Sequence, residues 1–206
     1  MNKAKQLKNV MVCMLFITLI SGCTTNKNAE VEATFGKEGK MAKKVLVAYG
    51  SFSGSTAETA VFIGKKLSEK GMEVDVKPVE KIKSIDGYNE VIIGAAIMMG
   101  RMKPSVVKFA EKYKEALNKV PVRFFVVCLT MIKDTPETRK TASGYLDPLR
   151  AIVKETGGSG LFPGRVKYKE IPYPQKILTW LPAFKKAVPE MDGMDWGKVE
   201  EWVGRS

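Results

Sequence analysis

The stretch that decides the fold runs from Lys44 to Thr56 and reads KVLVAYGSFSGST. Its first part, residues 44–49, is short, apolar and rich in β-branched residues, which predicts a strand buried on both faces. Apolar residues at helical spacing follow over 57–70, and Gly71 closes this predicted helix. The hydroxyl-rich segment therefore lies where a buried strand passes into a helix.

This connecting segment has the chemistry of a phosphate site. Its serines and threonine supply hydroxyl donors, Gly54 lets the backbone approach a ligand closely, and the helix start presents free N–H groups. Neither GxxxxGK[ST] nor GxGxxG is present, which excludes the two best-known phosphate fingerprints. The alternative is a serine-rich turn that only caps a helix. The candidate phosphate-binding residues are Ser51, Phe52, Ser53, Gly54, Ser55 and Thr56.

Strand and helix patterns alternate along the rest of the chain. Further strands are predicted over 72–76, 90–96, 122–129 and 161–168, and helices over 104–120, over 135–154 and from Asp195 to Val203. This alternation predicts an α/β, doubly wound, five-stranded parallel sheet in the order 2-1-3-4-5. In that order a ligand binds at the switch point between the first and third strands.

The register of the connecting segment resembles the flavodoxin family. Six positions match its signature, namely Val47, Tyr49, Ser51, Gly54, Thr56 and Ala60, whereas Ala48 is smaller than usual. The resemblance implies FMN as cofactor, with the flavin ring held by the loops after the third and fourth strands. The residues implied to contact the ring are Ala96, Ile97, Met98, Met99, Gly100, Arg101, Leu129, Thr130 and Met131.

The two ring loops depart from many flavodoxins because neither contains an aromatic residue. Two roles are open for Met98, Met99 and Met102. They replace the aromatic rings through sulfur contacts with the flavin, or they only pack the loop. Arg101 and Lys103 follow the first loop, where a cation would stabilise a reduced flavin anion. The other interpretation is that both point into water.

The general layout is similar to menaquinone-dependent protoporphyrinogen oxidases and their flavodoxin-domain relatives. The similarity rests on residues 94–100, on residues 135–138 and on an insertion over 170–194, although a Tyr-Gly-His type of ring loop is missing. Ile177, Leu181, Phe184 and Val188 form a helical stripe in the insertion, and lysines and Trp180 lie close by. Two readings stay open, a cover for the sheet edge beside strand five or a contact with a membrane interface.

The beginning of the chain has the pattern of a targeting signal. Lysines precede an apolar run of about 11 residues, too short to span a bilayer but typical of a signal peptide. Small residues before Cys23 resemble a lipobox, which implies cleavage and lipid attachment there. We expect a lipoprotein signal peptide over 1–22, a flexible tether over 23–42 and one flavodoxin-like domain over 43–206. The protein would then be an extracytoplasmic, membrane-anchored lipoprotein.

Composition excludes several kinds of chemistry. There is no histidine, which removes Ser-His-Asp and Cys-His catalysis and histidine metal sites, and three scattered cysteines form neither a disulfide framework nor a metal motif. We therefore predict no metal and name no catalytic side chain. The formal net charge is +12, and 1–22 hold three lysines and no acid, so a chain cleaved before Cys23 keeps +9.

Two functions follow from these observations. The leading one is a membrane-tethered FMN protein, either an electron carrier or an enzyme, whose partner is a quinone, a tetrapyrrole or an acidic redox protein. The alternative is a flavodoxin fold that acts as a basic, non-redox binding module, which the missing aromatics favour. A basic charge also suits nucleic acid, but the expected location argues against that partner. The oligomeric state is open.

Overall fold

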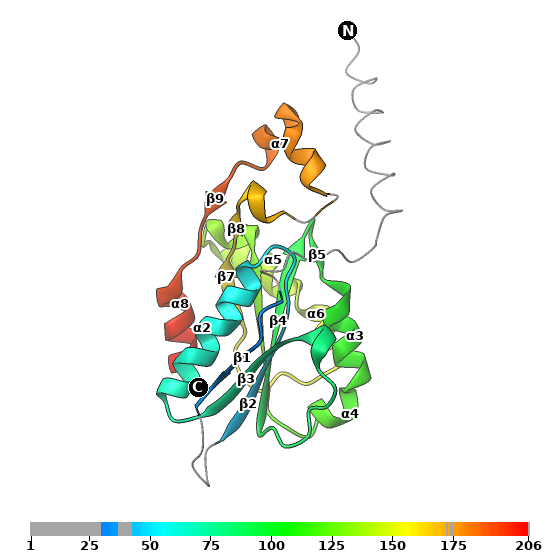
Figure 1. Cartoon of the computed structure of the whole chain (residues 1–206), viewed down its shortest axis with the longest axis vertical. Coiled ribbons are helices and arrows are strands. Elements are labelled where there is room, and N and C mark those ends of the chain that lie inside the picture. The colour runs from blue at the N-terminus through cyan, green and yellow to red at the C-terminus, as the bar shows by residue number, and fades with distance from the viewer. Residues whose placement is uncertain (1–29, 37–42, 172, 174, 206) are drawn as a thin grey trace.

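The computed structural model describes residues 30–36, 43–171, 173 and 175–205, and its centre is one twisted sheet (Figure 1). Five of its strands are parallel, and numbered among themselves they lie in the predicted order 2-1-3-4-5. In spatial order they are β3 (Glu73–Pro78), β2 (Lys44–Gly50), β4 (Glu90–Met98), β6 (Val122–Cys128) and β7 (Gly160–Pro163).

Helices cover both faces of the sheet, as strand-helix alternation predicts (Figure 1). One face carries α2 (Ser55–Glu69) and α8 (Trp196–Gly204), whose first turn is capped by the side chain of Asp195, as predicted. The other face carries α3 (Pro104–Lys112), α4 (Lys114–Leu117), α5 (Pro136–Gly144) and α6 (Asp147–Arg150).

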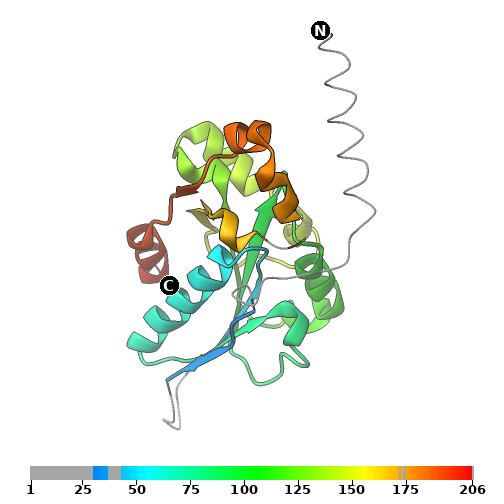
Figure 2. The ribbon, with the colours of Figure 1, turned by 45° about the horizontal axis from the view of Figure 1, so that its top comes forward.

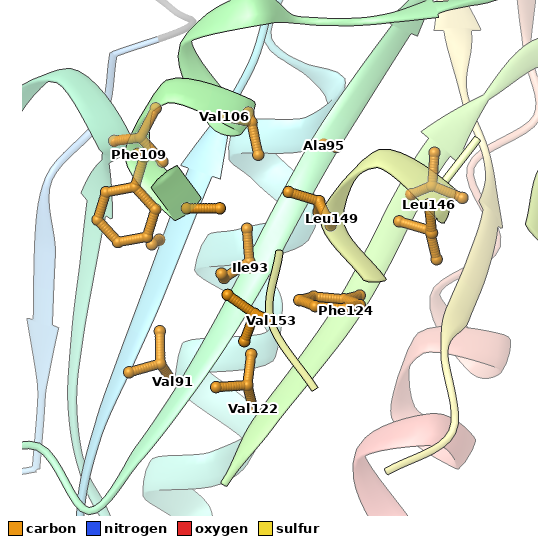
Figure 3. Close-up of a cluster of buried hydrophobic side chains, with 14 of the residues drawn as sticks. Val91, Ile93, Ala95, Val106, Phe109, Val122, Phe124, Leu146, Leu149 and Val153 are labelled. Carbon is orange, nitrogen blue, oxygen red and sulfur yellow. The ribbon is translucent and has the colours of Figure 1, made fainter. Parts of the chain in front are cut away.

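The core lies in two layers because successive strand residues point to opposite faces. Val91 and Ile93 pack with Phe109 and Leu149 under α3 and α6 (Figure 3), whereas Ile92, between them in sequence, packs under α2. The strand side chains are almost wholly buried on both faces, which is why these segments read as continuous apolar runs.

Several predicted elements are shorter than expected. The predicted helix over 104–120 is two helices, α3 and α4, because the backbone leaves helical geometry at Tyr113 (φ −107°, ψ 16°). The predicted helix over 135–154 is likewise divided into α5 and α6, and Pro148 lies in the first turn of α6. The predicted strand over 161–168 ends at Pro163, and a separate strand β8 (Arg165–Val166) pairs with β9 (Met191–Asp192).

The prediction of a flexible tether over 23–42 is wrong for the part that the structure describes. Ala33–Phe35 form strand β1, which pairs antiparallel with β3 at the edge of the sheet. Tyr49 holds Val31, which lies two residues before β1. The buried hydroxyl of Tyr49 donates to the Val31 carbonyl and accepts from the Val31 N–H, both at 2.7 Å. The expected signal peptide, Cys23, residues 24–29 and residues 37–42 lie outside the described residues.

The insertion forms short helical pieces rather than one amphipathic helix. After η4 (Tyr168–Glu170) come η5 (Gln175–Trp180) and α7 (Pro182–Ala187), separated at Leu181 because Pro182 opens the second piece. Of the two readings left open for its apolar stripe, a continuous cover over the edge beside strand five does not fit, since Ile177 is 48% exposed and Leu181 51%, although Phe184 and Val188 are half-buried. No helix in the described part of the chain is long and apolar enough to span a bilayer.

Candidate functional site

The candidate site lies at the carboxyl edge of the sheet, where β2, β4 and β6 end. Parallel pairing brings these three strand ends together, so the loops that follow them are neighbours in space. Figure 2 turns this end of the molecule toward the viewer, with the start of α2 and the insertion at the same edge. The sequence predicted all three loops as ligand-binding segments.

Residues 51–56, which we call the phosphate loop, are fixed by the backbone of one glycine. Gly54 has a left-handed conformation (φ 114°) and is the N-cap of α2, but no side chain caps the helix. The Gly54 N–H donates to the buried hydroxyl of Ser51 at 3.0 Å, which closes the loop on itself. The first-turn N–H groups of α2 are therefore left to an incoming acceptor, and the helix dipole favours an anionic one.

One side chain in the phosphate loop has a buried polar atom that no group in the described part of the chain satisfies. Thr56 is 0% exposed, and its Oγ1 has no hydrogen-bond partner among the described residues. Thr59, one turn later, instead donates to the carbonyl of Ser55 at 2.9 Å. Buried hydroxyls without partners are rare, and one at an uncapped helix start fits a bound phosphate oxygen. The donor set thus fits the phosphate of FMN.

The strand end before the phosphate loop is closely packed. A Cβ added at Gly50 would lie 2.4 Å from Cγ2 of Val106 and 3.3 Å from Cδ of Lys103. Only glycine fits there, because α3 approaches the backbone of β2 at this point. Sequence reasoning did not single out Gly50, although its place directly after an apolar strand was a usable signal.

Lys103 does not occupy either place considered for it from the sequence. Its side chain is 6% exposed and its Nζ lies 2.8 Å from a carboxylate oxygen of Glu80, which belongs to η2 (Val79–Lys81). Burial is the largest single influence on the Glu80 carboxyl and opposes its ionisation, but the hydrogen bonds from Lys103, Ser105 and the backbone, together with the charge of Lys103, hold the pKa of Glu80 below its ordinary value. Lys103 Nζ also lies 6.0 Å from the ring centroid of Phe52, so this lysine contacts both Glu80 and the phosphate loop.

The first predicted ring loop is a β-hairpin. β5 (Arg101–Met102) folds back on the end of β4, and Met98 pairs with Arg101. The two turn residues, Met99 and Gly100, both have positive φ, 52° and 74°, as type I′ turns require. Met99 is 80% exposed and Arg101 is exposed, whereas Ala96 is buried and Ile97 and Met98 are half-buried.

The second predicted ring loop is the short helix η3 (Leu129–Ile132). Leu129 and Ile132 are each 40% exposed at the carboxyl edge, and Thr130 lies 3.3 Å from the hydroxyl of Tyr145. Met131, which was also predicted to contact the ring, is 2% exposed and its side chain packs in the core. In a 3₁₀ turn successive side chains point about 120° apart, which turns Met131 inward while its neighbours point outward.

An arginine at the root of the insertion connects it to the start of α2. The guanidinium of Arg165 forms two hydrogen bonds with the carboxylate of Glu58, in the first turn of α2, and one of 3.1 Å with Glu170. Donation to the Glu58 carboxylate raises the pKa of Arg165 above its usual value. Sequence reasoning missed this connection because Glu58 and Arg165 are 107 residues apart.

A cavity of about 210 Å³ lies elsewhere, on the outer side of β7 against α8. Its charged residues pair with one another: Arg139 and Lys198 donate hydrogen bonds to Asp134 and hold the pKa of that carboxyl at about 2. The cavity does not lie over the ends of β2 and β4. We therefore do not assign it to the cofactor site.

Comparison with known proteins identifies relatives. Residues 46–187 match the family described as Flavodoxin domain. The chain is 32% identical over 108 residues to the protein named Protoporphyrinogen IX dehydrogenase [quinone] of Escherichia coli strain K12, an alignment that covers 50% of this chain and 60% of that protein. The same values hold for the protein of that name from Escherichia coli O157:H7.

Solved flavodoxins are among the structures to which this chain is similar. The two-electron reduced flavodoxin of Megasphaera elsdenii is 16% identical, with a TM-score of 0.49 over 79% of this chain and 99% of that chain. A flavodoxin of Streptococcus pneumonia TIGR4 is 15% identical, with a TM-score of 0.49 over 79% and 96%.

Proposed function

The chain belongs to the flavodoxin domain family, whose members are FMN-type redox proteins, and from this premise we propose that it exchanges electrons with a quinone or a tetrapyrrole at a membrane surface. FMN, when bound, supplies one-electron and two-electron transfer. The protein supplies binding, orientation and the electrostatic surroundings of the ring. No side chain is assigned a catalytic role.

The observation that carries the FMN assignment is the unpaired Thr56 hydroxyl beside the uncapped start of α2. Thr56 Oγ1 and the first-turn N–H groups of α2 would hold the phosphate, because these donors are buried and already in place without a ligand. Lys103 is paired with Glu80, so its positive charge is neutralised there and the phosphate would be held by neutral donors. The β4–β5 hairpin and η3 then flank the space beyond the phosphate loop.

The partner class is supported by the bacterial relatives. Their name specifies a quinone and protoporphyrinogen IX, but this chain spans only 60% of their length, so both partners are proposals for this protein. The basic net charge and the apolar insertion suit an anionic or apolar partner better than a basic one. An acidic redox protein is the remaining candidate of this class.

Membrane tethering is proposed through Cys23. Its support is the sequence pattern, in which an apolar run and small residues precede a cysteine, because these residues lie outside the described structure. Two acyl chains would hold the domain stably where one would not. Mass spectrometry of the mature protein should find a diacylglycerol-modified Cys23 at its N-terminus, and Cys23→Ala should leave the precursor unprocessed.

The test of function begins with the colour of the purified full-length protein. We expect flavin absorbance and, on denaturation, release of a flavin with the mass of FMN. The reduced protein should then be reoxidised by a menaquinone analogue, and protoporphyrinogen IX and NAD(P)H should be tested as donors. Oxidation of protoporphyrinogen under turnover would identify an enzyme, whereas exchange with a redox protein alone would identify a carrier.

A second candidate function is a non-redox binding module. The observation that favours it is the ring loops, where Met99 is 80% exposed and the segments 96–102 and 129–132 hold no aromatic residue. A colourless protein that takes up neither FMN nor riboflavin would support this function and contradict the first.

A further inference from the structure

The strand β1 determines from which side of the domain the N-terminal segment departs. β1 is antiparallel to β3, so its first residue, Ala33, lies toward the carboxyl end of β3, opposite Val76. The two hydrogen bonds between Val31 and Tyr49, and an ion pair between Glu32 and Lys81, hold the preceding residues at that same edge. The chain therefore leaves the domain beside the phosphate loop, not at the opposite end of the sheet.

The distance from this exit to the predicted anchor is short. Seven residues, 24–30, separate Cys23 from Val31, and a fully extended chain covers about 3.5 Å per residue, so the two lie at most about 28 Å apart. An anchor on such a lead holds the carboxyl edge of the sheet close to the lipid surface.

We call residues 171–189 the insertion tip; its described residues, 171, 173 and 175–189, lie at this edge and expose apolar surface. Trp180 is 74% exposed, Leu181 51% and Ile177 48%. Trp180 and Leu181 lie at the junction of η5 and α7, and Ile177 lies three residues before Trp180 in η5. In Figures 1 and 2 this orange segment lies beyond the end of the sheet that carries the phosphate loop. Tryptophan and aliphatic side chains with this exposure are typical of segments that enter a membrane interface.

The charges of the insertion are separated along the chain. The insertion tip holds three lysines and no acidic residue, Lys176, Lys185 and Lys186. The acidic residues lie at the root and are engaged there: Glu170 with Arg165, Glu190 with the Tyr168 N–H, and Asp192 with Lys167. A cationic tip around exposed tryptophan and leucine complements an anionic lipid surface.

We propose that the insertion tip is a second membrane contact, which docks on anionic phospholipid and turns the cofactor edge of the sheet toward the bilayer. Arg165 transmits this docking to the cofactor site, because it joins the root of the insertion to the first turn of α2. The anchor restrains the domain at one point, and the tip fixes its orientation. The inference rests on the proposed function in one respect, that the chain is held at a membrane.

The experiment uses the full-length protein reconstituted in vesicles of phosphatidylcholine with about 30% phosphatidylglycerol whose acyl chains carry bromine, a quencher of tryptophan fluorescence. The contribution of Trp180 is the difference between the wild type and Trp180→Phe. Trp196→Phe is the matched control, because Trp196 is 37% exposed but packs on Phe62 of α2, with ring centroids 5.0 Å apart. We expect the Trp180 contribution to fall by at least half and the Trp196 contribution to stay unchanged.

Charge is tested with a second pair of variants. Lys185→Gln with Lys186→Gln should lower the ratio of docked to undocked protein about fivefold for each lysine removed. Neutral phosphatidylcholine vesicles should also lower this ratio for the wild type. Lys112→Gln with Lys114→Gln, at the far end of α3 and in α4, should have no effect (Figure 1).

The outcomes separate this inference from the proposed function. Three results would overturn membrane docking. The first is equal quenching of Trp180 and Trp196, and the second is equal quenching in neutral and anionic vesicles. The third is a Trp180 fluorescence that changes only when an acidic protein is added. Flavin absorbance, measured on the same samples, reports the proposed function independently, so bound FMN with an unquenched Trp180 would leave that function standing while this inference fails.

Discussion

The phosphate loop and the insertion tip lie at the same edge of the sheet but are built in opposite ways. In the phosphate loop Ser51 is 1% exposed and Thr56 0%, and the backbone is fixed by Gly54 and by buried contacts. In the insertion tip Trp180 is 74% exposed and the helical pieces are short. A preorganised loop depends on single atoms, whereas an exposed surface depends on summed area, so one substitution should alter the loop far more than the tip.

The largest effect is expected from Gly54→Val. A β-branched residue is strained at a φ of 114°, and the phosphate loop must change shape to relieve it. We predict a loss of FMN affinity of at least about 100-fold, or about 2.7 kcal/mol, with little change for riboflavin, which lacks the phosphate. Titration of the apoprotein with both ligands measures it.

Gly71→Val is the matched control for that change. Gly71 also has a positive φ, 83°, but a Cβ there meets nothing within 4 Å and it lies at the far end of α2. It should lower the free energy of unfolding and leave FMN affinity intact. Equal losses of FMN and riboflavin in Gly54→Val would refute the assignment of the phosphate loop.

The next effect tests the connection between the two regions. Arg165→Met removes the guanidinium that pairs with Glu58 and with the 12%-exposed carboxylate of Glu170. We predict a loss of about 2 kcal/mol in the free energy of unfolding. This is less than for a fully buried pair because Glu58 is 41% exposed. Proteolysis within 171–189 should accelerate. Arg150→Met removes ion pairs of α6 instead, and an equal acceleration there would contradict a specific connection.

Thr56→Ala sharpens the comparison from within the loop. The hydroxyl has no partner among the residues that the structure describes, so its removal should not lower the stability of the apoprotein. FMN, in contrast, should bind about tenfold more weakly, or about 1.4 kcal/mol. Thr59→Ala should show the reverse, because that hydroxyl bonds the Ser55 carbonyl. Thermal unfolding without ligand and FMN titration together distinguish the two patterns, and a destabilised Thr56→Ala apoprotein would count against the phosphate role.

The smallest effect concerns Arg101 in the exposed hairpin. An exposed cation contributes about 0.2–1 kcal/mol to a nearby anion, which for one electron is about 10–40 mV. Arg101→Gln should lower the potential of the couple that forms fully reduced flavin by that amount. Arg205→Gln, 72% exposed at the end of α8, is the control. Potentiometric titration showing no difference between the two variants would exclude Arg101 from tuning the flavin.

The sequence predicted the buried strands and the phosphate loop because both are local patterns. An apolar run such as 44–49 determines its own burial, and a hydroxyl-rich segment directly after it can lie only at the carboxyl edge. Gly54 and Thr56 were therefore named from their neighbours alone. The two-residue strand β5 escaped prediction because a type I′ turn through Met99 is uncommon, as most such turns use Asn or Gly.

The features that sequence reasoning missed depend on residues far apart in the chain. Strand β1 has three residues, too few for an alternating pattern, and exists because β3 offers it an unpaired edge. The local sequence of Lys103, next to a predicted loop, does not show that it is buried. Its partner Glu80 lies 23 residues earlier, in η2, and only the fold brings the two together. Met131 looked available to a ligand because nothing in its local sequence shows which way a short 3₁₀ turn directs it.

The direction of β1 has a mechanical consequence. A pull on the chain before Glu30, directed away from the carboxyl edge, acts along the strand and not across it, so the backbone hydrogen bonds to β3 share the load instead of opening one by one. The two bonds from Tyr49 to Val31 lie where that load enters the fold. A domain held in this way resists tension on its lead even though the strand that bears it is only three residues long.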